Sequence, residues 1–442
     1  MRNRLAGLLP KSTFARRVGM LTGGTAFAQG LAVLALPVLT RLYSPADFSL
    51  LAIYTAVIGL VTVASCLRLN IAIPLPEHDE DAMNLLALSL IAALIISIAL
   101  ALAVFLLPTE ITGLLRQPNM KPYLWLIPAG VFLASVYNAL QYWTVRRKQF
   151  GLITRTRITR AVGGAGTQLA IGTAAPGPFG LIFGHMVYGG MGVLGLARKV
   201  WQHDRGLFPA VHKTALRQNL YTYRRFPTLS VPEALFNTGG IQFPVLMIAA
   251  LSAGPEAGFV MLAMRVMGLP MGLVGSSVAQ VYLAEAPNRL RAGTLAVFTR
   301  RTMWTLLKTG GPALIAAGAA APFLFPIVFG QDWARAGMIV AWMTPWFVLQ
   351  FVASPVSVVL HITGHLALAM GLQAFGLLLR VGAVAGAVWM GTGYMVEAFA
   401  LSGTVFYALY VLVVLVVIKL MGGANGTARQ DTHAIMDRER LL

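Results

Sequence analysis

Five ionisable side chains lie inside stretches of this sequence that are otherwise almost wholly apolar. Three are basic and two are acidic: Arg265, Lys308, Arg380, Glu233 and Glu397. A charged side chain at the centre of a membrane helix costs about 2.5 to 3.5 kcal/mol on insertion scales, so such residues usually face a wet cavity or a partner. An excess of buried positive charge predicts a cavity for an anionic substrate, such as a pyrophosphate or an acidic sugar.

Internal pairing is the alternative interpretation of these five residues. Arg380 could form a structural ion pair with Glu397, and Lys308 could do so with Glu233. Lys308 could also extend its alkyl chain to reach the inner surface. Arg265 then lacks an acidic partner at its depth, so we expect it to contact substrate. Glu233 and Glu397 could instead carry a coupled proton, because a buried carboxylate can titrate near neutral pH.

The elements that hold these residues are apolar stretches long enough to cross a bilayer. Of 442 residues 57% are hydrophobic and only 11% are charged, against about a quarter charged in soluble domains. A bilayer core needs about 20 apolar helical residues. Twelve stretches qualify, which predicts an all-α integral membrane fold: 18–40, 48–67, 82–107, 123–143, 158–175, 179–197, 226–251, 257–283, 303–328, 336–360, 366–390 and 394–418. The fifth is short and rich in glycine, and without it eleven would remain.

The basic residues indicate how these helices are oriented. Four of the 34 Lys and Arg residues fall in alternate loops on one side, and three lie deep within the spans, Arg265, Lys308 and Arg380. The other 27 lie at the opposite side, and we count among them Arg157 and Arg160, which are close to the start of the fifth span. The positive-inside rule therefore predicts that both termini are cytoplasmic. The net charge of +19 then reflects membrane topology, and we expect no nucleic-acid partner.

Other chemistry has little support in the sequence. The single cysteine, Cys66, lies in the second span, and no metal-binding motif is present, so we expect no disulfide, metal or cofactor. The loops on the outer side are short, the longest covering about 108–122, which leaves no room for a periplasmic catalytic domain. We therefore expect a transporter rather than an enzyme.

Three pairs of segments, separated by about 210 to 218 residues, indicate an internal duplication. Residues 44–52 resemble 254–263, residues 105–108 resemble 323–326, and Trp125 with Pro128 resembles Trp342 with Pro345. This spacing predicts two parallel six-helix halves around a central cavity. The expected parts are a basic N-terminus at 1–17, lobes at 18–198 and 226–420, a basic linker at 199–225 and a disordered tail at 421–442. Since the five buried charges all lie in the second half, we expect the first lobe to be a largely apolar wall.

Several short motifs are distributed along the chain: residues 39–48 (LTRLYSPADF), 67–76 (LRLNIAIPLP), 226–227, 263–270 (AMRVMGLP), 280–282, 285–286 and 329–333 (FGQDW). They resemble motifs of bacterial lipopolysaccharide O-antigen flippases, in the polysaccharide-export branch of the multidrug/oligosaccharidyl-lipid/polysaccharide superfamily. The similarity spans about 13–418.

This resemblance implies a MATE-like exporter fold in the bacterial inner membrane. It also implies that an undecaprenyl-pyrophosphate-linked oligosaccharide moves from the cytoplasmic to the periplasmic leaflet through a cationic cavity. Arg41, Arg68 and Arg265 lie within the matched motifs and are candidates for the phosphate or glycan path. The partners implied are the lipid-linked glycan, membrane lipids, and the polymerase and chain-length machinery of polysaccharide synthesis. Many relatives have Arg-Tyr-Glu after the second helix, whereas this chain has Arg68-Leu69-Asn70.

Two other functions remain open from the residues alone. A drug or cation antiporter of the same superfamily would be expected to place an acidic residue deep in its first or fourth helix, where this chain has Gln29 and Gln141. A membrane-embedded glycan polymerase or transferase would need a conspicuous polar catalytic loop. Neither expectation is met, which favours the flippase.

Overall fold

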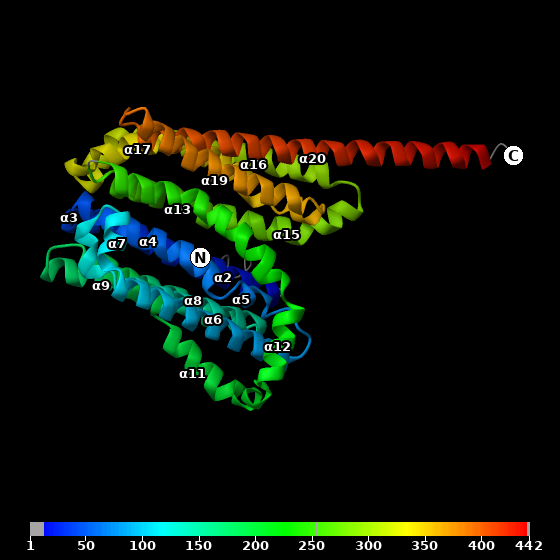
Figure 1. Ribbon diagram of the computed structural model, residues 1–442. Coiled ribbons are helices and arrows are strands. Elements are labelled where there is room, and N and C mark those ends of the chain that lie inside the picture. Colours follow the sequence, from blue (N-terminus) through cyan, green and yellow to red (C-terminus); the bar gives the residue numbers. More distant parts are fainter. Residues whose placement is uncertain (1–12, 253, 440–442) are drawn as a thin grey trace, which may run out of the picture.

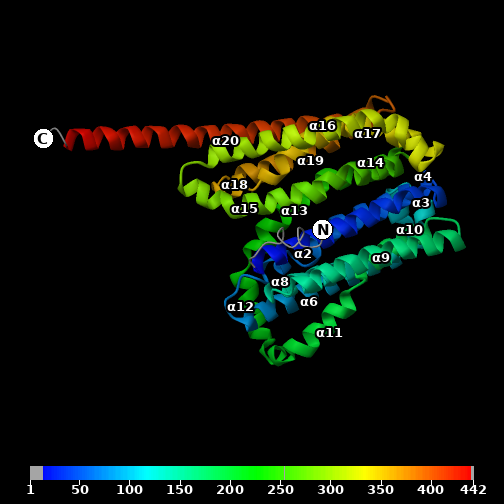
Figure 2. The same cartoon turned by 180° about the vertical axis from the view of Figure 1, so that it is seen from behind.

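The computed structural model describes the backbone of residues 13–252 and 254–439, and the side chains of residues 23–420 apart from 253, 284 and 366. Within these residues every regular element is a helix, and six long helices build each of two lobes. Figures 1 and 2 show the N-terminal lobe in blue to green, lying against the C-terminal lobe in green to red. The prediction of an all-α fold in two halves is confirmed.

The N-terminal lobe contains a broken first helix followed by five more long segments. Their bounds are α2 (Thr13–Leu34) with α3 (Leu36–Leu42), α4 (Pro45–Ser65), α5 (Leu69–Ala72), α6 (Asp79–Leu106), α7 (Pro108–Leu114), α8 (Leu126–Arg146), α9 (Phe150–Ala174), α10 (Phe179–Gly190) and α11 (Val193–Asp204). A capping box starts α4, because the Ser44 hydroxyl accepts from the Asp47 N–H while Asp47 accepts from the Ser44 N–H.

One predicted span of this lobe is interrupted. We expected a continuous helix over 179–197, but α10 ends at Gly190 and α11 leaves the bundle in a new direction (Figure 1). Gly192 adopts φ +104° between the two helices, a conformation that glycine tolerates and other residues rarely adopt. The predicted linker 199–225 therefore contains the last residues of α11 and the whole of α12 (Lys213–Thr222).

The C-terminal lobe follows the same plan. Its helices are α13 (Val231–Leu251), α14 (Glu256–Pro270), α15 (Ser276–Arg291), α16 (Leu295–Phe329), α17 (Ala334–Ala353), α18 (Val359–Ile362), α19 (Leu366–Trp389) and α20 (Met395–Glu439). The π-helical turn η5 (Met271–Gly275) joins α14 to α15. α20 continues to Glu439 (Figure 1), which takes it into the segment 421–442 that was predicted to be a disordered tail. The predicted N-terminal segment 1–17 lies mostly outside the described residues.

Ten helical stretches within the described residues are long and apolar enough to cross a membrane. The two predicted spans missing from this set correspond to α8 and α9, which form helices of 21 and 25 residues but carry more polar side chains. Gln141 on α8 and Arg157, Arg160 and Gln168 on α9 account for part of this polarity. All four residues line one cavity between the two lobes.

The two lobes meet where the predicted outer loops lie, and the duplicated segments form part of the contact. The segments begin α4 and α14, the second long helix of each lobe. The Gly258 N–H of α14 donates to the Ser49 hydroxyl of α4 over 2.9 Å. A side chain at Gly258 would collide with the Pro45 carbonyl, so the absence of a side chain permits this approach.

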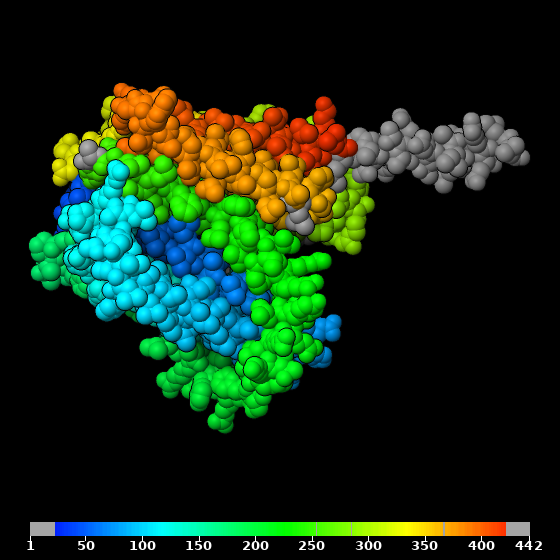
Figure 3. Space-filling view, viewed as in Figure 1, coloured from blue at the N-terminus to red at the C-terminus, as the bar shows by residue number. Residues whose placement is uncertain are grey.

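Aromatic packing extends this contact. The ring of Trp333, just before α17, is flanked edge-on by Phe48 at 4.8 Å and Phe259 at 5.9 Å. Phe48 and Phe259 belong to the two duplicated segments. We call this group the outer seal, consisting of Thr40, Phe48, Ser49, Gly258, Phe259 and Trp333. In the space-filling view the lobes touch along a seam in which blue α4 is visible (Figure 3).

Candidate functional site

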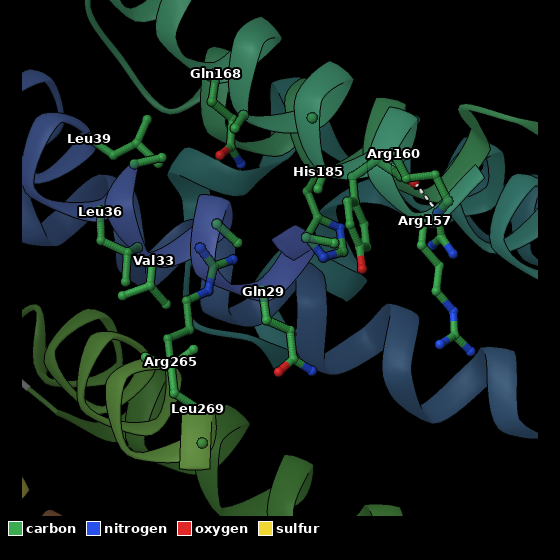
Figure 4. A pocket seen from close by; sticks show the side chains of 18 of the residues that line it. Gln29, Val33, Leu36, Leu39, Arg157, Arg160, Gln168, His185, Arg265 and Leu269 are labelled. Carbon is green, nitrogen blue, oxygen red and sulfur yellow. Dashed lines mark hydrogen bonds between the residues drawn. The ribbon is translucent and has the colours of Figure 1, made fainter. Parts of the chain in front are cut away.

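A cavity of about 520 Å³ lies between the two lobes. Helices α2, α3, α8, α9 and α10 of the N-terminal lobe line it together with α14 of the C-terminal lobe. Figure 4 shows Arg265 rising from α14 toward His185 and Gln29 on the opposite side, with Arg157 and Arg160 further along the same wall. The prediction that Arg265 faces a central space agrees with this position.

Two further arginines line the cavity on α9. The Arg157 Nη1 donates to the Thr25 hydroxyl of α2 over 2.5 Å. The Arg160 Nε donates to the Tyr188 carbonyl over 2.6 Å, the interaction dashed in Figure 4. The Arg160 guanidinium also lies 3.7 Å from the Tyr137 ring centroid and 4.5 Å from that of Tyr188. Stacking between two rings holds Arg160 in one orientation while it remains charged.

The expectation of an apolar first lobe is therefore wrong. Arg157 and Arg160 were assigned to a cytoplasmic loop because they are close to the start of a weak span, whereas α9 already begins at Phe150. A signal was present in the sequence. Arg157, Arg160, Gly164 and Gln168 recur every three or four residues, which places them on one face of a helix.

The cavity lining is cationic and polar without acidic groups. Three arginines line it, and no Asp or Glu of the described residues does so. Uncharged polar groups come from Gln29, Gln141, Gln168 and Tyr188. Gln168 donates to the Leu181 carbonyl over 3.1 Å, whereas the buried Gln29 Oε1 has no partner among the described residues. Anions are the ligands that such a lining favours.

A second hollow of about 280 Å³ adjoins the first. Arg265 and His185 line both, and α4 and α13 contribute the remaining wall through residues including Thr55 and Gln242. The Tyr54 ring packs edge-on against His185 at 5.7 Å. Arg265 thus stands between two compartments of the inter-lobe space, where it can contact a ligand in either.

Tyr43 connects the outer seal to the wall of the cavity. Its hydroxyl donates to the Gln168 carbonyl of α9 over 2.6 Å. Burial, with a smaller contribution from Asp47, raises the pKa of Tyr43 to about 12, so the hydroxyl keeps its proton at physiological pH and remains a donor. Gly172 and Gly180 leave the space that the Tyr43 ring occupies.

Four other predicted cations lie away from the cavity. Arg41 is exposed in the last turn of α3, and Arg68 lies between α4 and α5 with φ +58°. Lys308 is exposed on α16, with Nζ 5.3 Å from the Trp304 ring centroid, in a surface hollow also lined by Arg300 and Arg301. This exposure agrees with the alternative that Lys308 reaches the surface. Arg380 is buried inside the C-terminal lobe.

The acidic residues pair differently from the predicted ion pairs. Glu397 lies 2.7 Å from Arg335, and Arg335 also contacts Glu256 at 3.3 Å. Glu397 lies in the first turn of α20, whereas Arg380 contacts Phe406 and Tyr407 of the same helix. Phe406 follows Glu397 by nine residues, which is about 13.5 Å along a helix. The Arg380–Glu397 pair is therefore wrong.

Glu233 pairs with a histidine instead of Lys308. His361 Nε2 lies 3.2 Å from Glu233 Oε1, which joins α13 to α18. Both side chains are partly exposed, at 41% and 36%. The Lys308–Glu233 pair is wrong because Lys308 lies on the exposed face of α16.

Comparison with known proteins places this geometry in context. The chain resembles the inward-facing conformation of a multidrug resistance MATE family transporter of the MOP superfamily, with 14% identity, a TM-score of 0.59, and coverage of 89% of this chain and 95% of the other. The eukaryotic MATE transporter AtDTX14 gives 12% identity and a TM-score of 0.53, with coverage of 92% and 97%. At such identity the likeness establishes the fold alone.

Sequence comparison assigns the family. No curated protein matches the chain. The family model described as "Polysaccharide biosynthesis protein" matches residues 38–337, a range that includes the outer seal, α9 and Arg265. The chain is therefore a multi-pass membrane protein with the MATE fold, and it belongs to the family of polysaccharide biosynthesis proteins.

Proposed function

We propose that this protein is a flippase that moves an undecaprenyl-pyrophosphate-linked oligosaccharide across the bacterial inner membrane. The observation that carries the proposal is the inter-lobe cavity, where Arg265 of one lobe faces Arg157 and Arg160 of the other. Guanidinium groups bind phosphate oxygens through charged, often bidentate hydrogen bonds. Membership of a polysaccharide biosynthesis family supports a glycan as the remainder of the substrate.

The uncharged part of the lining suits a sugar. Gln29, Gln141 and Gln168 offer both donors and acceptors, and the Tyr188 ring, which also lines the cavity, can pack against the apolar face of a sugar ring. The second hollow beyond Arg265 gives an extended glycan further room. The substrate would then place its pyrophosphate at the arginines and its sugars along the glutamines.

The direction of transport follows from orientation. The positive-inside rule assigns the basic loops, and both termini, to the cytoplasm. The outer seal lies at the opposite end, so the cavity would take up substrate from the cytoplasmic side and release it after the seal opens. Alternating access of this kind requires the two lobes to rock about the central site.

The proposal includes coupling of transport to proton movement, with Glu233 as the residue that carries the proton. Its carboxylate is partly exposed and contacts only a histidine among the ion pairs found, so protonation would break one interaction. Glu397 is less suited because Arg335 holds it at 2.7 Å. Support for a cation antiporter is weaker, since none of the described residues lining the cavity is a carboxylate that could bind an organic cation.

The test uses a bacterium that lacks its own O-antigen flippase but makes the lipid-linked repeat unit. Wild-type protein should restore surface polysaccharide, and Arg265→Ala should lose it while the lipid-linked intermediate accumulates. The matched control is Arg300→Ala, which removes an exposed arginine of α16 outside the cavity. Membrane insertion is checked by immunoblot. Normal surface glycan with Arg265→Ala would contradict the proposed site.

A further inference from the structure

The Arg380 side chain is the most deeply buried cation in the described part of the chain, with 3% of its surface exposed. It lies on α19, and aromatic residues of α17 and α20 surround it. Its guanidinium carbon is 4.2 Å from the Phe406 ring centroid, 5.3 Å from that of Trp346 and 5.5 Å from that of Tyr407. Rings stabilise the faces of a guanidinium, but they cannot accept all of its N–H groups.

The unpartnered nitrogens of Arg380 are adjacent. Neither Nε nor Nη2 has a hydrogen-bond partner among the described residues. These two nitrogens form the side-on fork of the guanidinium, the edge that binds an anion through two parallel hydrogen bonds. The third nitrogen, Nη1, packs against Gly240 of α13. A Cβ atom added at Gly240 would lie only 3.0 Å from Nη1. The Tyr407 hydroxyl oxygen accepts a hydrogen bond from the Arg380 side chain.

A third donor lies in the same aromatic group. The indole Nε1 of Trp346 is buried without a partner in the described residues. Buried donors in native proteins are almost always satisfied by protein, water or an ion. Trp346 Nε1 and the two nitrogens of the Arg380 fork are therefore three buried donors that have no acceptor among the described residues.

The charge of Arg380 also lacks compensation. In the C-terminal lobe Glu233 is paired with His361, and Glu256 and Glu397 are both paired with Arg335. None of the described carboxylates forms an ion pair with Arg380. Burial of an uncompensated charge in a membrane protein is strongly unfavourable. Water could satisfy the donors, but only an anion would also neutralise the charge.

We propose that Arg380 and Trp346 hold a small monovalent anion, of the chloride class, inside the C-terminal lobe. The 3% exposure of Arg380 excludes a large ligand such as a lipid pyrophosphate. Arg380 is not among the residues that line either compartment between the lobes. The anion site is thus separate from the proposed substrate path, and its role is to stabilise the lobe that carries Arg265.

The first experiment uses the wild-type protein in detergent micelles. Thermal unfolding is measured while sodium chloride replaces sodium gluconate at constant ionic strength. An anion that binds only the folded state raises the Tm in a saturable manner, and we expect a rise of several degrees. Bromide should replace chloride, whereas the larger gluconate should not. A Tm that is equal in the two salts, or that changes linearly without saturation, would overturn the proposal.

Variants then locate the effect. Arg380→Lys retains the charge but removes the fork, and Trp346→Phe retains the aromatic ring but removes the N–H. Each should lower the apparent chloride affinity at least ten-fold, whereas Arg155→Lys, at an exposed position of α9 outside both compartments, should leave it unchanged. Iodide quenching of fluorescence, compared between wild type and Trp346→Phe, tests whether the halide reaches Trp346. If Arg380→Lys does not fold, Trp346→Phe still decides, because unchanged chloride affinity in that variant would contradict the site.

Discussion

The Trp333 indole donates a hydrogen bond of 3.0 Å to the carbonyl oxygen of Thr40, 293 residues earlier in the chain. This bond joins the end of the first helix of one lobe to the start of α17 in the other. It lies at the outer seal, opposite the end from which the cavity is proposed to fill. The bond must therefore break when the protein opens outward.

Trp333→Phe should shift the protein toward the outward-open state. The substitution retains the ring between Phe48 and Phe259 but removes a bond that contributes about 1 kcal/mol, which is about a five-fold change in population. A cysteine introduced at Ala32 in the cavity, with Cys66 replaced by serine, reports the state. Its labelling by an impermeant maleimide added outside intact cells should be about five-fold faster. Trp342→Phe, on the exposed face of α17, is the control, and equal rates for the two variants would argue against the seal.

Gly258→Ala should destabilise the contact between α4 and α14. The new methyl group would collide with the Pro45 carbonyl, and the backbone there cannot rotate away. Overpacking of this kind costs about 1 to 3 kcal/mol. Gly268→Ala is the matched control, since it lies in the same helix with nothing within 4 Å. Thermal unfolding in detergent should show a lower Tm for Gly258→Ala alone, and a wild-type Tm would mean that the seal tolerates a side chain.

Arg157→Gln and Arg160→Gln should each weaken transport. Loss of a charged hydrogen bond to phosphate costs about 1.5 to 3 kcal/mol, or roughly 10-fold to 150-fold in affinity. Arg155→Gln is the matched control, because Arg155 is on the same helix but exposed and outside the cavity. Binding of the lipid-linked glycan to purified variants provides the measurement. Comparable losses in all three variants would indicate a general charge effect instead of a site.

The sequence predicted helices and lobes well, but predicted side-chain environments unevenly. Arg265 lines the inter-lobe cavity, as expected for an isolated cation in an apolar helix, which has few other stable locations; its contact with substrate stays a prediction. Arg157 and Arg160 were misplaced because basic residues near a weak span are usually in a loop, whereas α9, which packs against α2 and α10, already begins at Phe150. For Arg380, the helices were correct, and the error was in the relative height of α19 and α20.

Lys308 illustrates the same limit. Its depth in the ninth span suggested a cavity, but depth along a helix does not specify which face the residue occupies. Arg300, Arg301, Trp304 and Lys308 share the exposed face of α16, with three- and four-residue spacing that the sequence contained. Whether that face contacts the rest of the lobe or the lipid depends on how α16 packs, and no local sequence pattern encodes this packing.

Glu233 and Glu397 should respond differently to removal of charge. Glu397→Gln breaks a largely buried pair with Arg335, whose side chain is 34% exposed, so we expect a loss of stability of about 1 to 3 kcal/mol with transport retained. Glu233→Gln removes the group proposed to bind the coupled proton while leaving a hydrogen-bonding amide beside His361. Its stability should be near wild type, because that pair is solvent-accessible, but its transport should no longer respond to a proton gradient. Proteoliposomes with and without an imposed gradient provide the measurement, and the Tm of each variant provides the control. If Glu233→Gln retains gradient-dependent flipping and Glu397→Gln loses it, the coupling role belongs to the Arg335–Glu397 pair and not to Glu233.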